Sequence, residues 1–157
     1  MTNDLSLRHT LATLAYRAAK VLRDAPPDFS DFRPGQNVRS AGEILSHMSD
    51  LLDWALSHAR GKQKWREAKP QSWAADSERF FTALANLDHY LASGAELHAP
   101  AGRLFQGAIA DALTHTGQIA MLRGLAGARV RPENYHVASI EAGRIGHDQP
   151  KPRREFD

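Results

Sequence analysis

The spacing of apolar residues constrains the fold of this chain more than any other feature. In four segments, at residues 5–23, 40–59, 76–93 and 102–125, apolar side chains recur at steps of three and four. This spacing places them on one face of a helix, whereas a half-buried strand would alternate at every second residue. No segment has a convincing strand pattern. The first stripe illustrates the spacing, with Leu7, Leu11, Leu14, Ala18 and Val21.

Four amphipathic segments of helical length predict an all-α protein built as a four-helix bundle. A chain of 157 residues suits a single domain with a sizeable core. We expect residues 1–125 to form the bundle. Residues 126–157, which contain three prolines, are expected to form an irregular C-terminal extension of the same domain.

Local signals predict where the helices begin and end. Pro26 and Pro27 end the first helix. Ser40 followed by Glu43 fits a capping box at the start of the second helix. Gly94 is well placed to terminate the third helix. The polar connector at residues 61–75 is long enough to travel the length of the bundle, so the second and third helices need not be antiparallel neighbours.

The composition narrows the class of protein. The formal net charge is only +2, and no basic patch interleaved with aromatic residues is present, so we expect no nucleic-acid partner. No apolar run approaches the roughly 20 residues of a membrane span, and no signal peptide is expected. The absence of cysteine excludes disulfides and thiolate ligands. A cytoplasmic protein is the default expectation.

Two polar residues, Asp111 and His115, interrupt the apolar stripe of the fourth predicted helix. Because residues i and i+4 project from the same face, a carboxylate oxygen and an imidazole nitrogen can converge on one ion. His47 interrupts the stripe of the second predicted helix and supplies a third donor. Two imidazoles and one carboxylate, with positions left open, form a recognisable constellation for a divalent metal.

An energetic argument supports a partner for Asp111. Burial of an unpaired carboxylate in a core costs several kcal/mol, a large part of a domain's net stability of roughly 5–15 kcal/mol. A metal would use Asp111 and His115 together and would also explain His47. The alternative is a hydrogen-bonded pair of Asp111 and His115 without an ion, and the spacing leaves both interpretations open.

Other polar residues near these three have simpler interpretations. Glu43 fits the helix cap better than support of His47, and Asp50, one turn from His47, is a candidate to orient it. Gln118 could orient a ligand or a water molecule. Arg123 could meet an anionic substrate, although a salt bridge is the simpler role. The remaining histidines lie too far along the helix or lack partner spacing: His9, His58, His89, His98, His136 and His147.

The order and spacing of these residues resemble the DinB superfamily, also called DinB/YfiT-like. Members carry a histidine on the second helix of a four-helix bundle and a ligand-x-x-x-His pair on the fourth, followed by a small residue, Gln, Ile and shortly by Arg. The resemblance covers the whole helical portion, and its most specific part is the run Thr-His-Thr-Gly-Gln-Ile-Ala-Met-Leu-Arg. Here the pattern is carried by His47, Asp111, His115, Gly117, Gln118, Ile119 and Arg123.

One residue departs from the commoner pattern of the family, which has three histidines. Asp111 stands where the first histidine of the pair is usual. Aspartate is a competent ligand, so we interpret the change as a two-histidine, one-carboxylate site. The resemblance also implies an up-down-down-up bundle, a homodimer and a site open to solvent on one side.

Relatives of known activity include thiol-dependent S-transferases and a maleylpyruvate isomerase that uses a thiol cofactor. Many others are described as metal-dependent hydrolases or as DNA-damage-inducible proteins, a label that concerns regulation and does not imply contact with DNA.

Two functions therefore compete. The first is a DinB-type enzyme in which His47, Asp111 and His115 hold Zn²⁺, Ni²⁺, Fe²⁺ or Mn²⁺ and activate water or a small-molecule thiol, as a hydrolase or a thiol S-transferase. A thiol route would need an external low-molecular-weight thiol, because the chain has no cysteine. No catalytic residue is assigned. The alternative is a non-catalytic dimeric bundle that binds a small ligand or a partner, with Asp111 and His115 as a structural polar pair.

Overall fold

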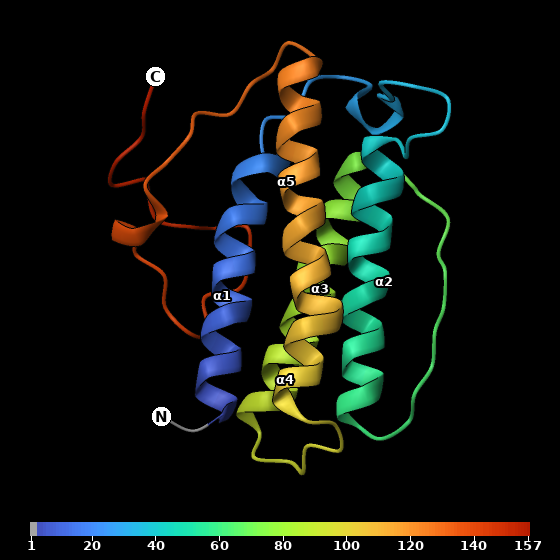
Figure 1. Ribbon diagram of the computed structural model, residues 1–157, viewed down its shortest axis with the longest axis vertical. Coiled ribbons are helices and arrows are strands. Elements are labelled where there is room, and N and C mark those ends of the chain that lie inside the picture. The colour runs from blue at the N-terminus through green and yellow to red at the C-terminus, as the bar shows by residue number, and fades with distance from the viewer. Residues whose placement is uncertain (1–2) are drawn as a thin grey trace.

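Four long helical segments pack side by side in the computed structural model, which describes residues 3–157 (Figure 1). They are α1 (Asn3–Leu22), α2 (Ala41–Ala59), α3 (Trp73–Ala92) and a fourth segment composed of α4 (Ala101–Leu104), η2 (Phe105–Ile109) and α5 (Ala110–Leu125). Within the described residues, strand-type pairing is limited to one isolated bridge between Glu133 and Glu155. The prediction of an all-α protein is confirmed.

Two observations concern the ends of the chain and the membrane. No helix in the described part combines the length and apolar composition that a membrane span requires. The expectation that the chain carries no signal peptide concerns its N-terminal segment. Residues 1 and 2 of that segment lie outside the described residues.

The core lies where the four segments meet. α1 packs against α3 and α5, and α2 packs against the same two helices. Burying one large apolar side chain stabilises a fold by about 1.5–3 kcal/mol, so a core shared by all segments holds them together. Its fully buried members include Leu11, Leu14, Leu45, Met48, Leu52, Phe80, Leu84, Leu87, Ile109 and Ile119.

The helix ends follow local chemistry. The capping box of α2 is confirmed: Glu43 N–H donates to Ser40 Oγ at 3.2 Å, and Ser40 N–H donates to the Glu43 carboxylate at 2.7 Å. Gly94, with φ of 72°, follows the end of α3 as expected. α3 begins at Trp73, three residues before the predicted start, because Ser72 caps it and Trp73 packs edge-on against Phe29.

The connector at residues 62–72 runs along the outside of α2, back toward the end of the bundle where α2 begins (Figure 1). Hydrogen bonds attach it to α2 near both of its ends: Lys64 N–H donates to Ser57 Oγ at 3.0 Å, Ser46 Oγ donates to Ala68 O at 3.2 Å, and Ala68 N–H donates to the Asp50 carboxylate at 3.3 Å. This path brings the indole of Trp65 to 5.8 Å from the imidazole of His47, measured between ring centroids.

A π-helical turn, η2, precedes α5 and changes the face that the helix buries. In such a turn the hydrogen bonds reach five residues instead of four, so the register of the following residues shifts. The buried stripe of α5 passes through Ala112, His115, Ile119 and Leu122. Asp111 lies beside this stripe and its side chain is 47% exposed. The expectation that Asp111 is buried on the core stripe is therefore wrong, and the energetic argument for a partner does not apply to it.

Residues 126–157 contain the short helix η3 (Tyr135–Val137) and the isolated bridge. Buried ionic contacts attach this segment to α1. The Lys20 ammonium lies 2.9 Å from a carboxylate oxygen of Glu133 and 2.9 Å from one of Glu155. The Tyr16 hydroxyl donates to Glu133, and burial together with this bond raises the pKa of Tyr16.

Candidate metal centre

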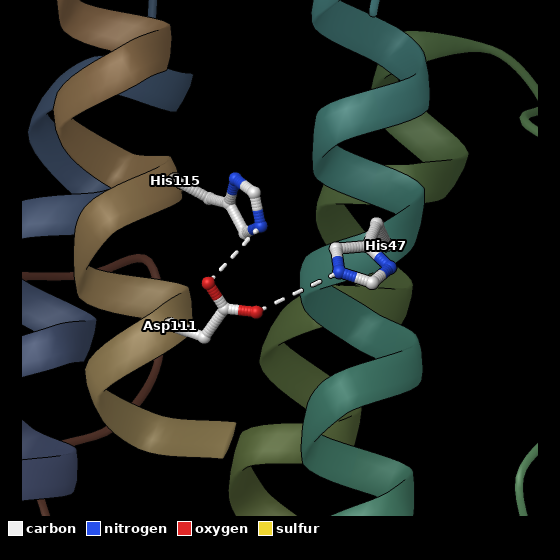
Figure 2. Close-up of side chains that lie close together, drawn as sticks. All are labelled: His47, Asp111 and His115. Carbon is white, nitrogen blue, oxygen red and sulfur yellow. Dashed lines mark ion pairs between the residues drawn. The ribbon is translucent and has the colours of Figure 1, made fainter. Parts of the chain in front are cut away.

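The three residues singled out in the sequence converge at the seam between α2 and α5 (Figure 2). His47 comes from α2, and Asp111 and His115 come from successive turns of α5. One donor atom from each residue lies within 4.8 Å of the other two. Figure 2 shows the carboxylate of Asp111 between the two imidazoles, with one oxygen directed at each ring.

The separations of the donor atoms distinguish a hydrogen-bonded pair from a set of metal ligands. His115 Nε2 lies 3.5 Å from Asp111 Oδ1, and His47 Nε2 lies 3.8 Å from Asp111 Oδ2. Both distances exceed the 2.7–3.2 Å of ordinary N–H···O hydrogen bonds. Two ligands about 2.1 Å from a tetrahedral ion stand roughly 3.4 Å apart. The three donors are therefore close enough to share one ion, and neither histidine is in direct hydrogen-bond contact with the carboxylate.

His115 is oriented by its neighbour Gln118. Its Nδ1 lies 2.6 Å from Gln118 Oε1. An amide oxygen only accepts hydrogen bonds, so Nδ1 is the donor in this contact, and Nε2 is the ring nitrogen that faces Asp111. Ligand histidines in metal sites commonly have such a partner on the second nitrogen. His115 is also buried, with only 8% of its surface exposed, which fixes the ring in place.

His47 stands in an environment that favours its neutral form. Burial lowers the pKa of His47, and the positive charge of Arg39 and the neighbouring His115 lower it further. Neutral imidazole is the form that binds metals. The rings of His47 and His115 lie edge to face with their centroids 5.0 Å apart. The indole of Trp65 also lies edge to face with His47, with the ring centroids 5.8 Å apart.

Two cavities flank the three residues. The first, of about 490 Å³, is lined by His47 and by polar residues of α2 and the connector, among them Asp50 and Lys69. The second, of about 360 Å³, is lined by His115, Gln118 and mostly apolar side chains. Together with the half-exposed carboxylate of Asp111, they leave room for a small molecule beside any ion held there.

Asp50, expected as a candidate to orient His47, instead forms an ion pair with Arg79 of α3. Glu43 serves the helix cap, as expected, and its second oxygen lies 3.0 Å from Arg33. Burial raises the pKa of Asp53, which also lies near Arg79. These carboxylates are therefore engaged away from the three donors.

Arg123 neither forms a salt bridge nor faces the candidate centre. Its buried guanidinium donates to the main-chain carbonyls at the end of α1, those of Val21, Arg23 and Asp24, at 2.8–3.1 Å. Carbonyls at a helix C-terminus lack helical donors and carry partial negative charge, so a cation satisfies them well. Arg123 therefore has a structural role at the end of α1, in place of the salt bridge or the contact with an anionic substrate considered from the sequence.

The histidines predicted at the surface are exposed: His9, His89, His98, His136 and His147. Two residues near the centre carried no signal in the sequence. Trp65 lies in the polar connector, and Arg39 precedes the cap of α2. Their proximity to His47 depends on the path of the connecting segments, which residue spacing does not reveal.

The chain was compared with protein-family models, with curated proteins and with solved structures, and none of them matches. The interpretation of the centre therefore depends on its own geometry and chemistry.

Proposed function

We propose that this chain is a metal-dependent enzyme of the DinB type, with His47, Asp111 and His115 holding a divalent ion. The observation that carries the proposal is the convergence of three donor atoms, one each from His47, Asp111 and His115, within 4.8 Å of one another. The oriented Nδ1 of His115 supports it.

The up-down-down-up topology and the homodimer implied by the family resemblance belong to the same proposal. The path of the connector at residues 62–72, along the outside of α2, supports the topology because it lets α2 and α3 start at the same end of the bundle.

When bound, a divalent ion lowers the pKa of water or of a small-molecule thiol and so supplies a nucleophile near neutral pH. The chain's own residues prepare this chemistry. Asp111 offsets part of the charge of the ion, while Gln118 keeps Nε2 of His115 available. The indole of Trp65 lies beside His47, and the two cavities leave the approach open elsewhere.

The donor set favours borderline ions. Imidazole suits Zn²⁺, Ni²⁺ and Fe²⁺, and a carboxylate also accommodates Mn²⁺. An ion that activates water would support hydrolysis, and the same ion activating a small-molecule thiol would support thiol transfer. Because the chain has no cysteine, the thiol would come from an external low-molecular-weight compound.

The proposal is tested by loading the full chain with each of the four ions and measuring two reactions: hydrolysis of an activated ester and transfer of a small thiol to an electrophilic fluorophore. We expect one of them with at least one ion, and we expect chelation or Asp111→Ala to abolish it. His89→Ala, an exposed histidine on α3, is the matched control and should keep full activity. Activity that survives both chelation and Asp111→Ala would contradict a metal-dependent reaction, whereas the absence of both reactions with every ion would favour the non-catalytic binding module.

A further inference from the structure

Arg39 lines both cavities beside the three donor residues. It lies one residue before Ser40, the cap of α2, so its main chain is fixed by a well-formed helix start. Arg39 and His47 line the first of these cavities together. Arg39 is therefore the cation of the chain best placed to meet a molecule that lies against the centre.

Arg39 has no direct partner within the described chain. Among residues 3–157 its exposed side chain has no hydrogen bond or ion pair, although its charge helps to lower the pKa of Glu43. Arg33 pairs with Glu43 and Arg79 pairs with Asp50, whereas Glu67, which also lines the first cavity, has no such pair in residues 3–157. A guanidinium at a cavity without a direct partner can take an anionic ligand. Its planar fork matches a carboxylate in two parallel hydrogen bonds.

The second cavity supplies an apolar wall next to this cation. Val38, Met121 and Leu125 are 44%, 69% and 60% exposed, and all three line it together with Ile44. Single exposed apolar residues are ordinary, but several around one cavity indicate a binding surface. The wall continues to His115, so an apolar chain lying on it would extend from Arg39 toward the three donors.

We propose that the site takes a small carboxylic acid with an apolar chain: the carboxylate pairs with Arg39, and the chain packs on Val38, Ile44, Met121 and Leu125. The inference rests on the proposed function and names the substrate class of that same centre. The reacting group of the molecule would then lie between Arg39 and the donors.

The test is isothermal titration calorimetry of the full chain, loaded with the ion that it binds, against 4-phenylbutyrate and its neutral amide. We expect wild type to prefer the carboxylate. Arg39→Gln should weaken carboxylate binding about two- to fivefold, because a pair with an exposed side chain contributes little, and leave binding of the amide unchanged. Arg39→Lys keeps the positive charge but loses the two parallel donors of the guanidinium. Its affinity for the carboxylate should lie between those of wild type and Arg39→Gln.

Two controls make the result specific. Arg66→Gln removes an exposed arginine that lines neither cavity, and it should bind both probes like wild type. A series from butyrate to octanoate tests the apolar wall, with each added methylene expected to tighten binding roughly three- to fourfold. Equal binding of carboxylate and amide, or an Arg39→Gln variant that binds the carboxylate like wild type, would overturn the inference.

The metal content of each sample separates the two proposals. Metal-loaded wild type without a carboxylate preference would refute only the substrate class. A wild type that cannot hold an ion would refute the metal proposal, and an Arg39-dependent preference measured in that same sample would still support the carboxylate site.

Discussion

Asp111 connects the two histidines of the centre, since each of its carboxylate oxygens faces a different imidazole. Because its side chain is half-exposed, it does not need a partner to be tolerated in the fold. Its position directs one carboxylate oxygen toward each imidazole, an arrangement compatible with the proposed ion site. Gln118 contacts the other ring nitrogen of His115, Nδ1, and so affects the centre through His115.

Substitutions of Asp111 should separate a ligand role from a structural one. We expect Asp111→Asn to lose metal affinity by at least about 100-fold, because a neutral amide is a poor ligand for these ions. Asp111→His should retain binding and prefer Ni²⁺ or Zn²⁺ over Mn²⁺ more strongly than wild type, since imidazole replaces a carboxylate. Competition titrations with a metal-sensitive dye measure both. Equal affinity of wild type and Asp111→Asn would exclude Asp111 as a ligand.

Gln118 is predicted to position His115 without touching the ion. Gln118→Ala should weaken metal binding about 10- to 100-fold, the usual effect of removing such a partner, while the helical circular dichroism stays unchanged. Gln118→Glu keeps an acceptor oxygen and should restore most of the affinity. The control is Gln106→Ala, an exposed glutamine of η2. A Gln118→Ala variant with wild-type affinity would show that the contact at 2.6 Å does not matter for the centre.

At the scale of elements, the start of α2 determines where His47 and Arg39 lie. The capping box fixes the first turn, and the ion pair of Glu43 with Arg33 draws the preceding connector against it. The hydrogen bond from Ser40 N–H and the charge of Arg33 lower the pKa of Glu43. The carboxylate is thus stabilised in its charged form by the same contacts that begin the helix.

The sign of the pH dependence follows. A carboxyl group whose pKa is lowered in the folded state stabilises the folded state at pH values above its ordinary pKa of about 4.3. This stabilisation is lost as the pH falls through the lowered pKa of the folded protein. Glu43→Ala should therefore reduce the free energy of unfolding by about 0.5–1 kcal/mol at pH 7, a modest value because the side chain is partly exposed. At pH 3 the difference from wild type should be much smaller.

Urea denaturation of wild type and Glu43→Ala at pH 7 and pH 3 measures the free energy of unfolding and so tests this pH dependence. Glu78→Ala is the control, because Glu78 is an exposed glutamate of α3 without a hydrogen bond or ion pair in the described part of the chain. A difference between wild type and Glu43→Ala that is the same at pH 3 and pH 7 would mean that the charge of Glu43 contributes nothing.

The helices and the donor triad could be predicted because both follow from residue spacing along single helices. The start of α3 could not, since the packing of Trp73 on Phe29 joins residues far apart in the sequence. The π-helical turn η2 also escaped prediction, because no residue of the segment singles out a hydrogen bond that reaches five residues instead of four. Asp111 lies beside the buried stripe of α5, which passes through Ala112, His115, Ile119 and Leu122.

At the scale of the whole molecule, residues 126–157 are joined to the bundle by charged groups that are almost fully buried. The side chains of Lys20 and Glu133 are 4% and 0% exposed, whereas that of Glu155 is 27% exposed. Removing one member of a buried ion pair leaves the other charged and without compensation, which costs far more than breaking an exposed pair. Separately, the buried Arg123 joins α5 to the end of α1.

Glu133→Ala should therefore destabilise the protein by about 3 kcal/mol, reduced somewhat by the remaining pairing of Lys20 with Glu155. Glu155→Ala removes the more exposed carboxylate that pairs with the same lysine and should destabilise the protein clearly less than Glu133→Ala. Urea denaturation monitored by circular dichroism measures both variants. Equal losses in the two would show that burial of Glu133 does not control the attachment of residues 126–157.

The most direct test of the metal centre is elemental analysis by mass spectrometry of the tag-free protein, purified without chelators. Wild type is compared with His47→Ala, Asp111→Ala, His115→Ala and the control His89→Ala. We predict near-stoichiometric divalent metal in wild type and in His89→Ala, and its loss in the other three variants while their helical content is retained. A wild type that contains no metal and cannot be reloaded would contradict the account and leave Asp111 and His115 as a structural polar pair.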